Sequence, residues 1–203
     1  MNVHLVQPPA MALITDKKLA IFESTLTLIR ENGFHGTPMS QIAKKAGVAA
    51  GTIYHHFDSK DMLIMELHEY VLNKMLDSLL QADEDQMAYK ERFFNFFISH
   101  CLFYMEHPNA LFFMEQFVNS PYNSRQTTQE NERAQGTFKN LIKYGVDHRL
   151  LKALDDRIVG SLVHGSVVTT AKIHLCRKIP LGPAELQQIA QMIWDGMKNP
   201  ETT

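Results

Sequence analysis

A chain of 203 residues with a formal net charge of −2 is large enough to bury its own core and too close to neutral to act as a basic coat on nucleic acid. Its residues are 45% hydrophobic and 21% charged, as is usual in globular proteins and unlike disordered chains. The two cysteines, Cys101 and Cys176, are too few for a disulfide framework and lack metal-ligand spacing, so we interpret both as reduced thiols and expect no metal site.

Residues 1–14, which include Pro8 and Pro9, are expected to form a flexible arm ahead of the first helix. This arm lacks the basic start and long apolar run of a secretory signal, and the chain offers no run of about 18 apolar residues that would span a membrane. We therefore expect a cytoplasmic protein with no membrane partner, in which either Met1 or Met11 is the first translated residue.

The first predicted helix runs from Thr15 to Asn32. Its apolar residues recur at helical spacing along one stripe, which consists of Leu19, Phe22, Leu26 and Ile29. The Thr15 hydroxyl is suited to cap the start of this helix, and Gly33 can end it in the left-handed conformation.

Two short helices are predicted on either side of Gly47. The first runs from about Pro38 to Ala46, with Thr37 as its N-cap and Pro38 at the first helical position, where a missing N–H costs nothing. The second runs from about Ala49 to Phe57. Small and apolar residues lie where the two helices would cross, namely Ile42, Ala43, Ala46, Val48 and Ile53. Two helices that cross over a short glycine-containing turn form a helix-turn-helix, whose second helix enters a DNA major groove.

Six longer helices are predicted after this motif, with a polar break at Pro121–Arg125. They cover Lys60 to about Ala82 with Ser59 as a cap, Met87–Glu106, Pro108–Asn119, Gln126–Asp147, Asp155–Cys176 and Pro183–Lys198. No strand pattern competes with them. The sequence therefore predicts an all-α protein of about nine helices, with a head of three short helices that contains the helix-turn-helix over residues 15–60 and a body of longer helices over residues 61–203.

Charge is distributed unevenly between these two parts. Residues 15–60 carry six basic and four acidic residues, a net charge of +2, which leaves −4 for the rest of the chain. A mildly basic head on an acidic body fits a DNA-binding module joined to a part that does not touch DNA.

The stretch from Glu31 to Leu63, ENGFHGTPMSQIAKKAGVAAGTIYHHFDSKDML, resembles the N-terminal domain of the TetR family. The positions that carry the resemblance are Gly33-Phe34, Thr37, Ile42-Ala43, Ala46-Gly47-Val48, Gly51-Thr52-Ile53-Tyr54, Phe57 and Ser59-Lys60. The chain departs from the family at Ala49-Ala50, where Ser or Thr followed by Lys is usual. Ala49 offers no cap oxygen and Ala50 no phosphate contact, which weakens the expected grip on the DNA backbone.

The resemblance implies a transcription regulator that binds a pseudo-palindromic operator as a homodimer, with residues 15–60 as its DNA-binding domain and residues 61–203 as its ligand-binding and dimerisation domain. A repressor released by a small molecule is the expected form, and an activator of the same fold is the alternative. The residues carried over as DNA contacts are Thr37, Ser40, Gly51, Thr52, Tyr54, His55 and Lys60. The residues expected in the core of this domain are Ile42, Ala43, Val48, Ile53 and Phe57.

The region from Met87 to Phe117 is rich in aromatic residues on more than one helical face. Such helices are buried in a core or line a cavity, and the resemblance favours the cavity because the family encloses an apolar pocket in this domain. The candidate lining residues are Phe97, Cys101, Tyr104, Phe113, Phe117 and His164, with His100 and Glu115 as further polar groups. These side chains suggest a small hydrophobic or aromatic effector.

The last two predicted helices each have an apolar face. On the first it comprises Ile158, Leu162, Gly165, Val168 and Thr169, and on the second Leu186, Ile189, Ile193 and Met197 with Trp194 beside them. In the family, two such helices from each subunit form a four-helix interface. The resemblance therefore implies a homodimer through the last two helices.

Two other classes of protein fit this sequence less well. An enzyme could use some of the ten histidines, but the chain has no HExxH, GxSxG, P-loop or Rossmann motif, and His100 and His107 lie seven residues apart, which does not suit zinc. A helical small-molecule carrier would explain the aromatic region but not the helix-turn-helix. We therefore expect no catalytic residues, no cofactor and no metal.

Overall fold

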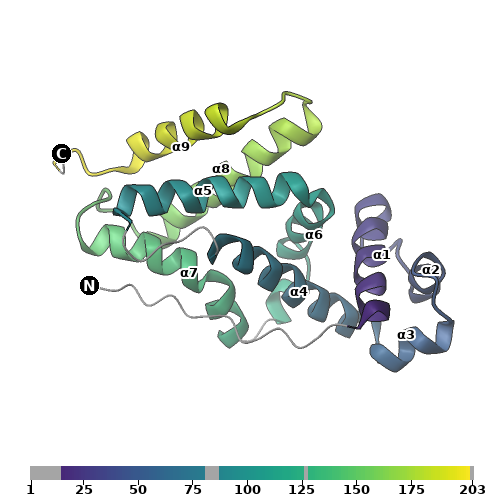
Figure 1. The fold of residues 1–203 in the computed structure, drawn as a ribbon. Helices are drawn as coiled ribbons and strands as arrows, with labels where there is room; N and C mark the ends of the chain where they lie inside the picture. The colour runs from purple at the N-terminus through teal and green to yellow at the C-terminus, as the bar shows by residue number, and fades with distance from the viewer. Residues whose placement is uncertain (1–14, 81–86, 126–127, 202–203) are drawn as a thin grey trace. The chain divides into compact units, whose positions relative to one another are not determined.

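The computed structural model describes residues 15–80, 87–125 and 128–201 (Figure 1). The regular secondary structure of the described residues consists of helices. These are α1 (Asp16–Asn32), α2 (Met39–Lys45), α3 (Ala50–His56), α4 (Lys60–Leu80), α5 (Tyr89–Glu106), α6 (Pro108–Val118), the 3-10 helix η1 (Asn123–Arg125), α7 (Thr128–Asp147), α8 (Asp156–Cys176) and α9 (Pro183–Met197). Over those same ranges the β-type pairing is limited to one bridge between Leu151 and Lys198. The predicted all-α fold is confirmed, and the predicted arm at residues 1–14 lies outside the described residues.

Helix α1 begins and ends as its sequence predicts, but it buries a wider face. The Thr15 hydroxyl accepts a hydrogen bond from the Lys18 N–H at 3.3 Å, and Gly33 ends the helix with a φ of 68°. Leu19 is 39% exposed, so the predicted stripe is wrong at that position. The buried face instead comprises Ile21, Phe22, Ser24, Thr25, Leu26, Leu28 and Ile29, because the helix is covered on more than one side.

The start of α2 differs from the prediction. Pro38 is the N-cap, with extended backbone, and the helix begins at Met39. Thr37 is fully buried, and its hydroxyl donates to the carbonyl oxygen of Gly33 at 2.8 Å. The hydroxyl therefore satisfies a backbone group at the C-terminal end of α1, where helix carbonyls lack partners within the helix, and does not cap α2.

The chain divides into two compact units. The head unit contains α1, α2, α3, α4 as far as Lys74, α6 and η1, and the body unit contains the end of α4 from Met75, α5, α7, α8 and α9. The domain boundary expected after residue 60 follows the sequence motif and stays a prediction. Helix α6 belongs to the head unit, although it follows α5 in the sequence, because it packs on α1.

The core of the head unit is built around Phe22. Its ring lies 5.6 Å from that of Phe57 and 5.1 Å from that of Tyr70, measured between ring centroids. Ile42 and Ile53 are fully buried where α2 and α3 pack together. Gly47 joins these helices with a φ of 67°, as the predicted sharp turn requires.

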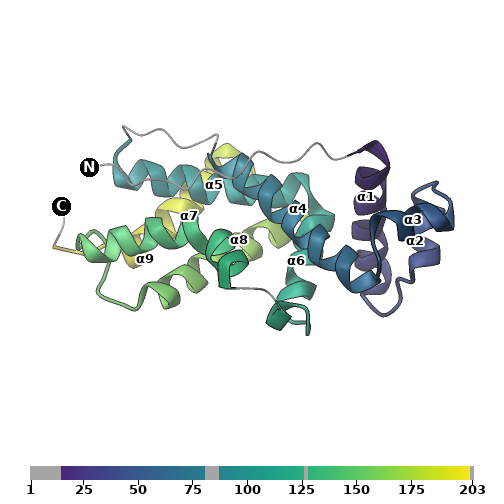
Figure 2. The same ribbon diagram turned by 90° about the horizontal axis from the view of Figure 1, so that it is seen from below.

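In the body unit, α5 packs on α8 and α9, and α7 packs on α8 (Figures 1 and 2). Trp194 of α9 lies with its ring centroid 5.9 Å from that of Tyr89 and 5.7 Å from that of Phe93. Aromatic packing of this kind joins the end of the chain to α5. No helix in the part of the chain that the structure describes combines the length and apolar character needed to cross a membrane.

Candidate nucleic-acid interface and ligand site

Helix α3 presents one face to solvent and buries the other. Ile53 is fully buried, whereas Tyr54 is 55% exposed and Gly51 and His55 are also exposed. Thr52 is half-buried at the edge of this face. As its sequence predicts, Ala49 precedes the helix without a side-chain cap. The outer face of α3 is therefore available to a large partner such as a DNA groove.

The remaining predicted DNA contacts, Ser40, Thr37 and Lys60, differ in how exposed their side chains are. Ser40 is exposed in the first turn of α2. Thr37 is buried, so a contact through its side chain would require the hydroxyl to leave the Gly33 carbonyl. Lys60 is half-buried, and its ammonium group donates to the carbonyl oxygen of Phe34. Burial lowers the pKa of Lys60, and the neighbouring Asp61 carboxylate opposes that shift.

Lys18 is a structural cation of the head unit. Its Nζ lies 2.6 Å from Glu66 Oε2, and it stands over the rings of Phe22 and Phe57 at 5.7 and 5.4 Å from their centroids. Lys44 and Lys45 are exposed at the end of α2, where Lys45 lies 4.0 Å from Glu31. Within the helix-turn-helix, the exposed lysines are therefore on α2 and not on α3.

Side-chain hydrogen bonds tie α6 to α1 within the head unit. Arg30 Nη1 donates to Asn109 Oδ1 at 3.0 Å, and the guanidinium stands 4.9 Å from the centroid of the Phe112 ring. Asn109 Nδ2 also donates to Thr27 Oγ1 at 3.3 Å, and Gln116 Nε2 donates to the Ile29 carbonyl at 3.2 Å. We refer to this network as the α1–α6 clasp. The sequence reasoning missed it, because polar contacts between residues about 80 positions apart leave no local pattern.

The six predicted ligand-lining residues are not brought into one unit. Phe113 and Phe117 lie on α6 in the head unit, where Phe113 packs against Phe34 at 6.0 Å and Phe117 stacks on His68 at 4.0 Å. The other four residues are in the body unit. Phe97, Cys101 and Tyr104 of α5 are buried, and His164 of α8 is exposed.

His100 is the most distinctive polar group of the body unit. Its side chain is 4% exposed, and within the described part of the chain its Nε2 has no hydrogen-bond partner. Its ring lies 5.7 Å from that of Phe96, 4.9 Å from that of Tyr104 and 5.5 Å from that of His164.

Burial keeps the interior of α5 uncharged. It lowers the pKa of His100 to about 3, with a smaller contribution from the charge of His164. Burial also raises the pKa of the Cys101 thiol to about 12. At neutral pH the cluster therefore presents a neutral imidazole and a thiol among aromatic rings, with one nitrogen left to bond. Among the described residues, no group of three or more His, Cys, Asp or Glu is arranged to hold a metal ion.

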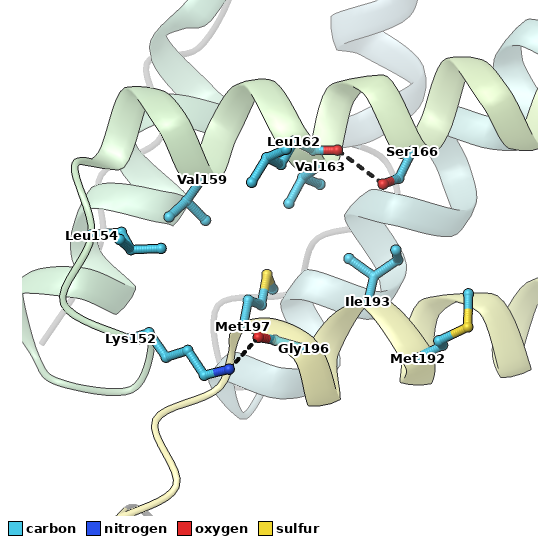
Figure 3. Close-up of a pocket in the computed structure, with 10 residues that line it drawn as sticks. All are labelled: Lys152, Leu154, Val159, Leu162, Val163, Ser166, Met192, Ile193, Gly196 and Met197. Carbon is cyan, nitrogen blue, oxygen red and sulfur yellow. Dashed lines mark hydrogen bonds between the residues drawn. The ribbon is translucent and has the colours of Figure 1, made fainter.

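Helices α8 and α9 enclose an apolar groove of about 260 Å³ (Figure 3). Leu162 and Val163 line it from α8, and Met192 and Ile193 line it from α9. The exposed fractions of Leu162 and Met192 are 64% and 65%, and Ile158 nearby on α8 is 53% exposed. Helices α8 and α9 therefore gather exposed apolar side chains on one face beside this groove, a pattern that marks interaction surfaces.

The predicted apolar face of α9 is divided in the structure. Leu186 and Trp194 are buried within the body unit, so they belong to its core. Ile189, Ile193 and Met197 are half-buried at the edge, and Met192, which the prediction omitted, is exposed. On α8 the predicted residues Ile158, Leu162, Gly165 and Thr169 are exposed, and Val168 is half-buried.

Comparison with known proteins gives two sequence profiles that match this chain. One, described as "Bacterial regulatory proteins, tetR family", matches residues 21–67 and so contains α2 and α3. The other, described as "Tetracyclin repressor-like, C-terminal domain", matches residues 88–198, more than half of the chain.

Two curated relatives are similar over part of their length. The fatty acid metabolism regulator protein of Bacillus subtilis (strain 168) is 32% identical over 76 residues, which make up 37% of this chain and 39% of the relative. An uncharacterized HTH-type transcriptional regulator of Haemophilus influenzae is 29% identical over 107 residues, 53% of this chain and 57% of the relative. The chain thus spans less than two thirds of either relative.

One solved structure is similar over almost its whole length. A TetR family transcription regulator from Marinobacter aquaeolei VT8 has a TM-score of 0.82 at 20% identity, over 91% of this chain and 96% of that chain. At this identity the likeness shows a shared fold, which includes both the short helices around α3 and the longer helices that follow.

Proposed function

Because the chain belongs to the TetR family of bacterial regulatory proteins, we propose that it regulates transcription by binding a pseudo-palindromic operator as a homodimer. The matched family and relatives are regulators and not enzymes, in agreement with the sequence prediction. The observation that carries the proposal is the α2–α3 pair, whose second helix turns an exposed face with Tyr54 and His55 to solvent. A protein with this task works where the DNA is, so we place it in the cytoplasm.

In this proposal the residues that touch DNA are Ser40, Gly51, Thr52, Tyr54 and His55. The exposed α3 side chains enter the major groove, and the Ser40 hydroxyl reaches a phosphate. Thr37 and Lys60 are assigned a different role. Both bind backbone carbonyls at or after the end of α1, so they hold the helix-turn-helix in shape and act on DNA affinity indirectly.

The apolar face of α8–α9 supports the homodimer. A two-fold interface places each subunit's Leu162 and Met192 region against the same face of its partner, which removes an exposed apolar surface from water. Dimerisation also presents two recognition helices. They occupy successive major grooves only when they lie about 34 Å apart, which makes operator affinity sensitive to small changes of shape.

The effector is proposed to bind in the body unit beside α5. Phe97, Cys101 and Tyr104 supply an apolar environment, and the unpartnered Nε2 of His100 supplies one hydrogen bond. His164 of α8 lies against His100 at the exposed side of this cluster. A small, mainly hydrophobic molecule with a single polar group fits these side chains.

Two helices connect this region with the DNA-binding surface. Helix α4 belongs to both units, and α6 follows α5 directly and is tied to α1 by the α1–α6 clasp. Suppose that a ligand binds more tightly to a conformer whose recognition helices are wrongly spaced for the operator. Such a ligand must weaken operator binding, at most by the ratio of its affinities for the two conformers. Repression with release by the effector is therefore the proposed mode, with Phe113 and Phe117 moving as part of α6.

The proposal is tested by a mobility-shift titration with the DNA upstream of the protein's own gene. We expect sequence-specific binding by the wild-type dimer and a loss of about 1–3 kcal/mol with Tyr54→Ala, as for removal of one good groove contact. Ile179→Ala, an equally exposed apolar residue outside α3, is the control and should bind normally. Binding that does not depend on DNA sequence, or that survives Tyr54→Ala unchanged, would refute this docking.

Induction is measured in the same assay with a panel of hydrophobic compounds, chosen first by their thermal stabilisation of the protein. A stabilising compound should lower operator affinity by 5- to 150-fold, the usual range of coupling between two sites. Compounds that stabilise the protein but raise its operator affinity would instead identify a co-repressor or an activator mode.

A further inference from the structure

We infer that the effector is an uncharged hydroxyl compound with an apolar body, bound by a hydrogen bond between its hydroxyl group and His100 Nε2, and that carboxylates and amines of the same size are rejected. The inference rests on the effector site proposed for the body unit. It adds to that site the charge class of the ligand and the atom that selects it.

The first observation is a buried nitrogen that is free to bond. His100 of α5 is buried, and among the described residues its Nε2 has no hydrogen-bond partner. Buried polar atoms in folded proteins nearly always have a partner in the protein, in water or in a ligand, because a missing bond costs free energy. A ligand that bonds to Nε2 removes this cost, so the atom marks a point at which binding is rewarded.

The surroundings of His100 are aromatic and come from three helices. Its ring lies 5.7 Å from that of Phe96 and 4.9 Å from that of Tyr104, both on α5, and 5.5 Å from that of His164 on α8. Phe96 in turn stacks on Phe138 of α7 at 4.6 Å. His164 is exposed, so the cluster reaches the surface on the α8 side. An apolar molecule with one polar atom complements such a set of rings.

The cluster offers no partner to an ionic group. The rings that contact His100 in the described part of the chain include no carboxylate, lysine or arginine. Burial lowers the pKa of His100 to about 3, and the charge of His164 adds to the shift. The imidazole therefore stays neutral at neutral pH. A carboxylate or ammonium group placed against it would lose its hydration without gaining an opposite charge, whereas a hydroxyl group loses far less.

A hydroxyl group also suits both forms of the neutral ring. One nitrogen of a neutral imidazole donates and the other accepts, and the tautomer decides which of them is Nε2. A hydroxyl group can donate and accept, so it bonds to Nε2 in either tautomer. A carbonyl oxygen only accepts, and it fits one tautomer alone. Hydroxyl compounds are therefore the uncharged class that His100 binds most readily.

The test uses the full-length protein and a series of compounds that differ in one group. The series comprises para-butylbenzyl alcohol, para-butylbenzoate, para-butylbenzylamine and para-butyltoluene, together with their hexyl and octyl homologues. Binding is measured by calorimetry at about pH 8, where histidines are ordinarily neutral. We expect the alcohol to bind about fivefold more tightly than the toluene, the factor for one hydrogen bond. The carboxylate and the amine should bind at least about 100-fold more weakly than the alcohol.

Two variants connect this selectivity to the cluster. In His100→Phe the alcohol should lose its advantage over the toluene, while the toluene still binds, an outcome that a purely structural role of His100 would not produce. His164→Arg places a cation beside His100, and it should raise the affinity of the carboxylate about tenfold relative to the alcohol. His148→Arg is the matched control, because His148 is an exposed histidine of the body unit that packs on Tyr144 at the end of α7. Light scattering checks that each variant has the assembly state of the wild type.

The inference is overturned if the carboxylate or the amine binds as tightly as the alcohol, or if no compound of the series binds. It is also overturned if the alcohol keeps its advantage over the toluene in His100→Phe. In these cases the proposed regulation stands as long as the protein without ligand binds its operator specifically in the mobility-shift assay. Loss of specific operator binding would instead overturn the proposed function, whatever the compounds do.

Discussion

The side chain of Lys60 donates a hydrogen bond to the backbone carbonyl of Phe34. This bond joins the first residue of α4 to the loop that follows α1, across the two helices of the helix-turn-helix that lie between them in the sequence. A lysine at this position looks like a phosphate contact when only the sequence is read. In the structure one of its N–H groups is already bound to the protein itself, which is why we propose a mainly structural role for Lys60.

Replacing Lys60 with alanine should therefore destabilise the fold as well as weaken DNA binding. Loss of the hydrogen bond leaves the Phe34 carbonyl without this partner, which we expect to cost about 1 kcal/mol in urea unfolding. Operator affinity should fall, but the slope of its logarithm against the logarithm of salt should stay unchanged. If Lys60 neutralised a phosphate, that slope would flatten by roughly one unit, and such a flattening would contradict the structural role.

Charged substitution on α8 should separate the subunits. Leu162→Glu places a carboxylate on the apolar face that we propose to be buried in the dimer, where an unpaired charge is costly. We expect a monomer by light scattering at micromolar concentration, with operator affinity reduced because only one half-site is bound at a time. Ile179→Glu is the matched control, since Ile179 is 51% exposed and does not line the α8–α9 groove. A Leu162→Glu protein that remains dimeric would show that the subunits meet elsewhere.

His100 should make stability depend on pH. Its folded pKa is about 3, below the ordinary value of 6.5, so between these values the unfolded chain binds a proton that the folded protein does not. The contribution of neutral His100 to the free energy of unfolding is therefore fully present above pH 6.5 and is lost as the pH falls towards 3. The loss is at most about 1.4 kcal/mol per pH unit, or about 2 kcal/mol by pH 5.

The His100→Phe variant isolates this effect. Unfolding measured from pH 7 to pH 5 should show a shallower decline in the variant than in the wild type. At pH 7 the variant should be as stable as the wild type or more so, because it removes a buried nitrogen without a partner. Its binding of stabilising effector compounds should weaken. Parallel pH profiles for the two proteins would mean that His100 gains a proton, or a partner, in the folded state.

The α1–α6 clasp should transmit the effector's influence. Arg30→Ala removes both the bond to Asn109 and the contact with the Phe112 ring, while Arg30 itself is exposed. Operator affinity without effector should change little, whereas the ratio of affinities with and without effector should fall towards one. Lys17→Ala, another exposed charged residue of α1, is the control. An unaltered ratio in Arg30→Ala would leave α4 as the transmitting helix.

Local chemistry made the helix boundaries predictable. Thr15 and Gly33 form the ends of α1 as expected, because capping and a left-handed glycine depend on neighbours within one turn. Thr37 shows the limit of that reasoning. Its sequence position suits an N-cap of α2. In the structure, however, its hydroxyl donates to the carbonyl oxygen of Gly33, at the other end of the loop that follows α1. The choice between two nearby backbone partners depends on the path of the loop, which the sequence pattern does not contain.

The DNA-binding residues could be predicted from the sequence more fully than the ligand-binding residues. Exposed residues of α3 follow from helical periodicity and from the buried position of Ile53. The ligand residues do not, because aromatic residues are spread around α5 and α6 and no periodicity tells which helix packs with which. Phe113 and Phe117 therefore lie in the head unit, although the sequence groups them with α5. His100, which has the unpartnered nitrogen, has no sequence feature that sets it apart from the other polar residues of this region.

If the apolar face of α8–α9 forms the proposed dimer interface, the stability of each subunit depends on how many copies the cell contains. If the dimer buries Leu162 and Met192, its folding free energy includes an association term that grows with the logarithm of protein concentration. A regulator made in few copies spends more of its time as single subunits, which expose this face to proteases and to self-aggregation. On this proposal, low expression would shorten the lifetime of the protein as well as lower its amount, so promoter occupancy would respond more steeply to synthesis rate than for a stable monomer.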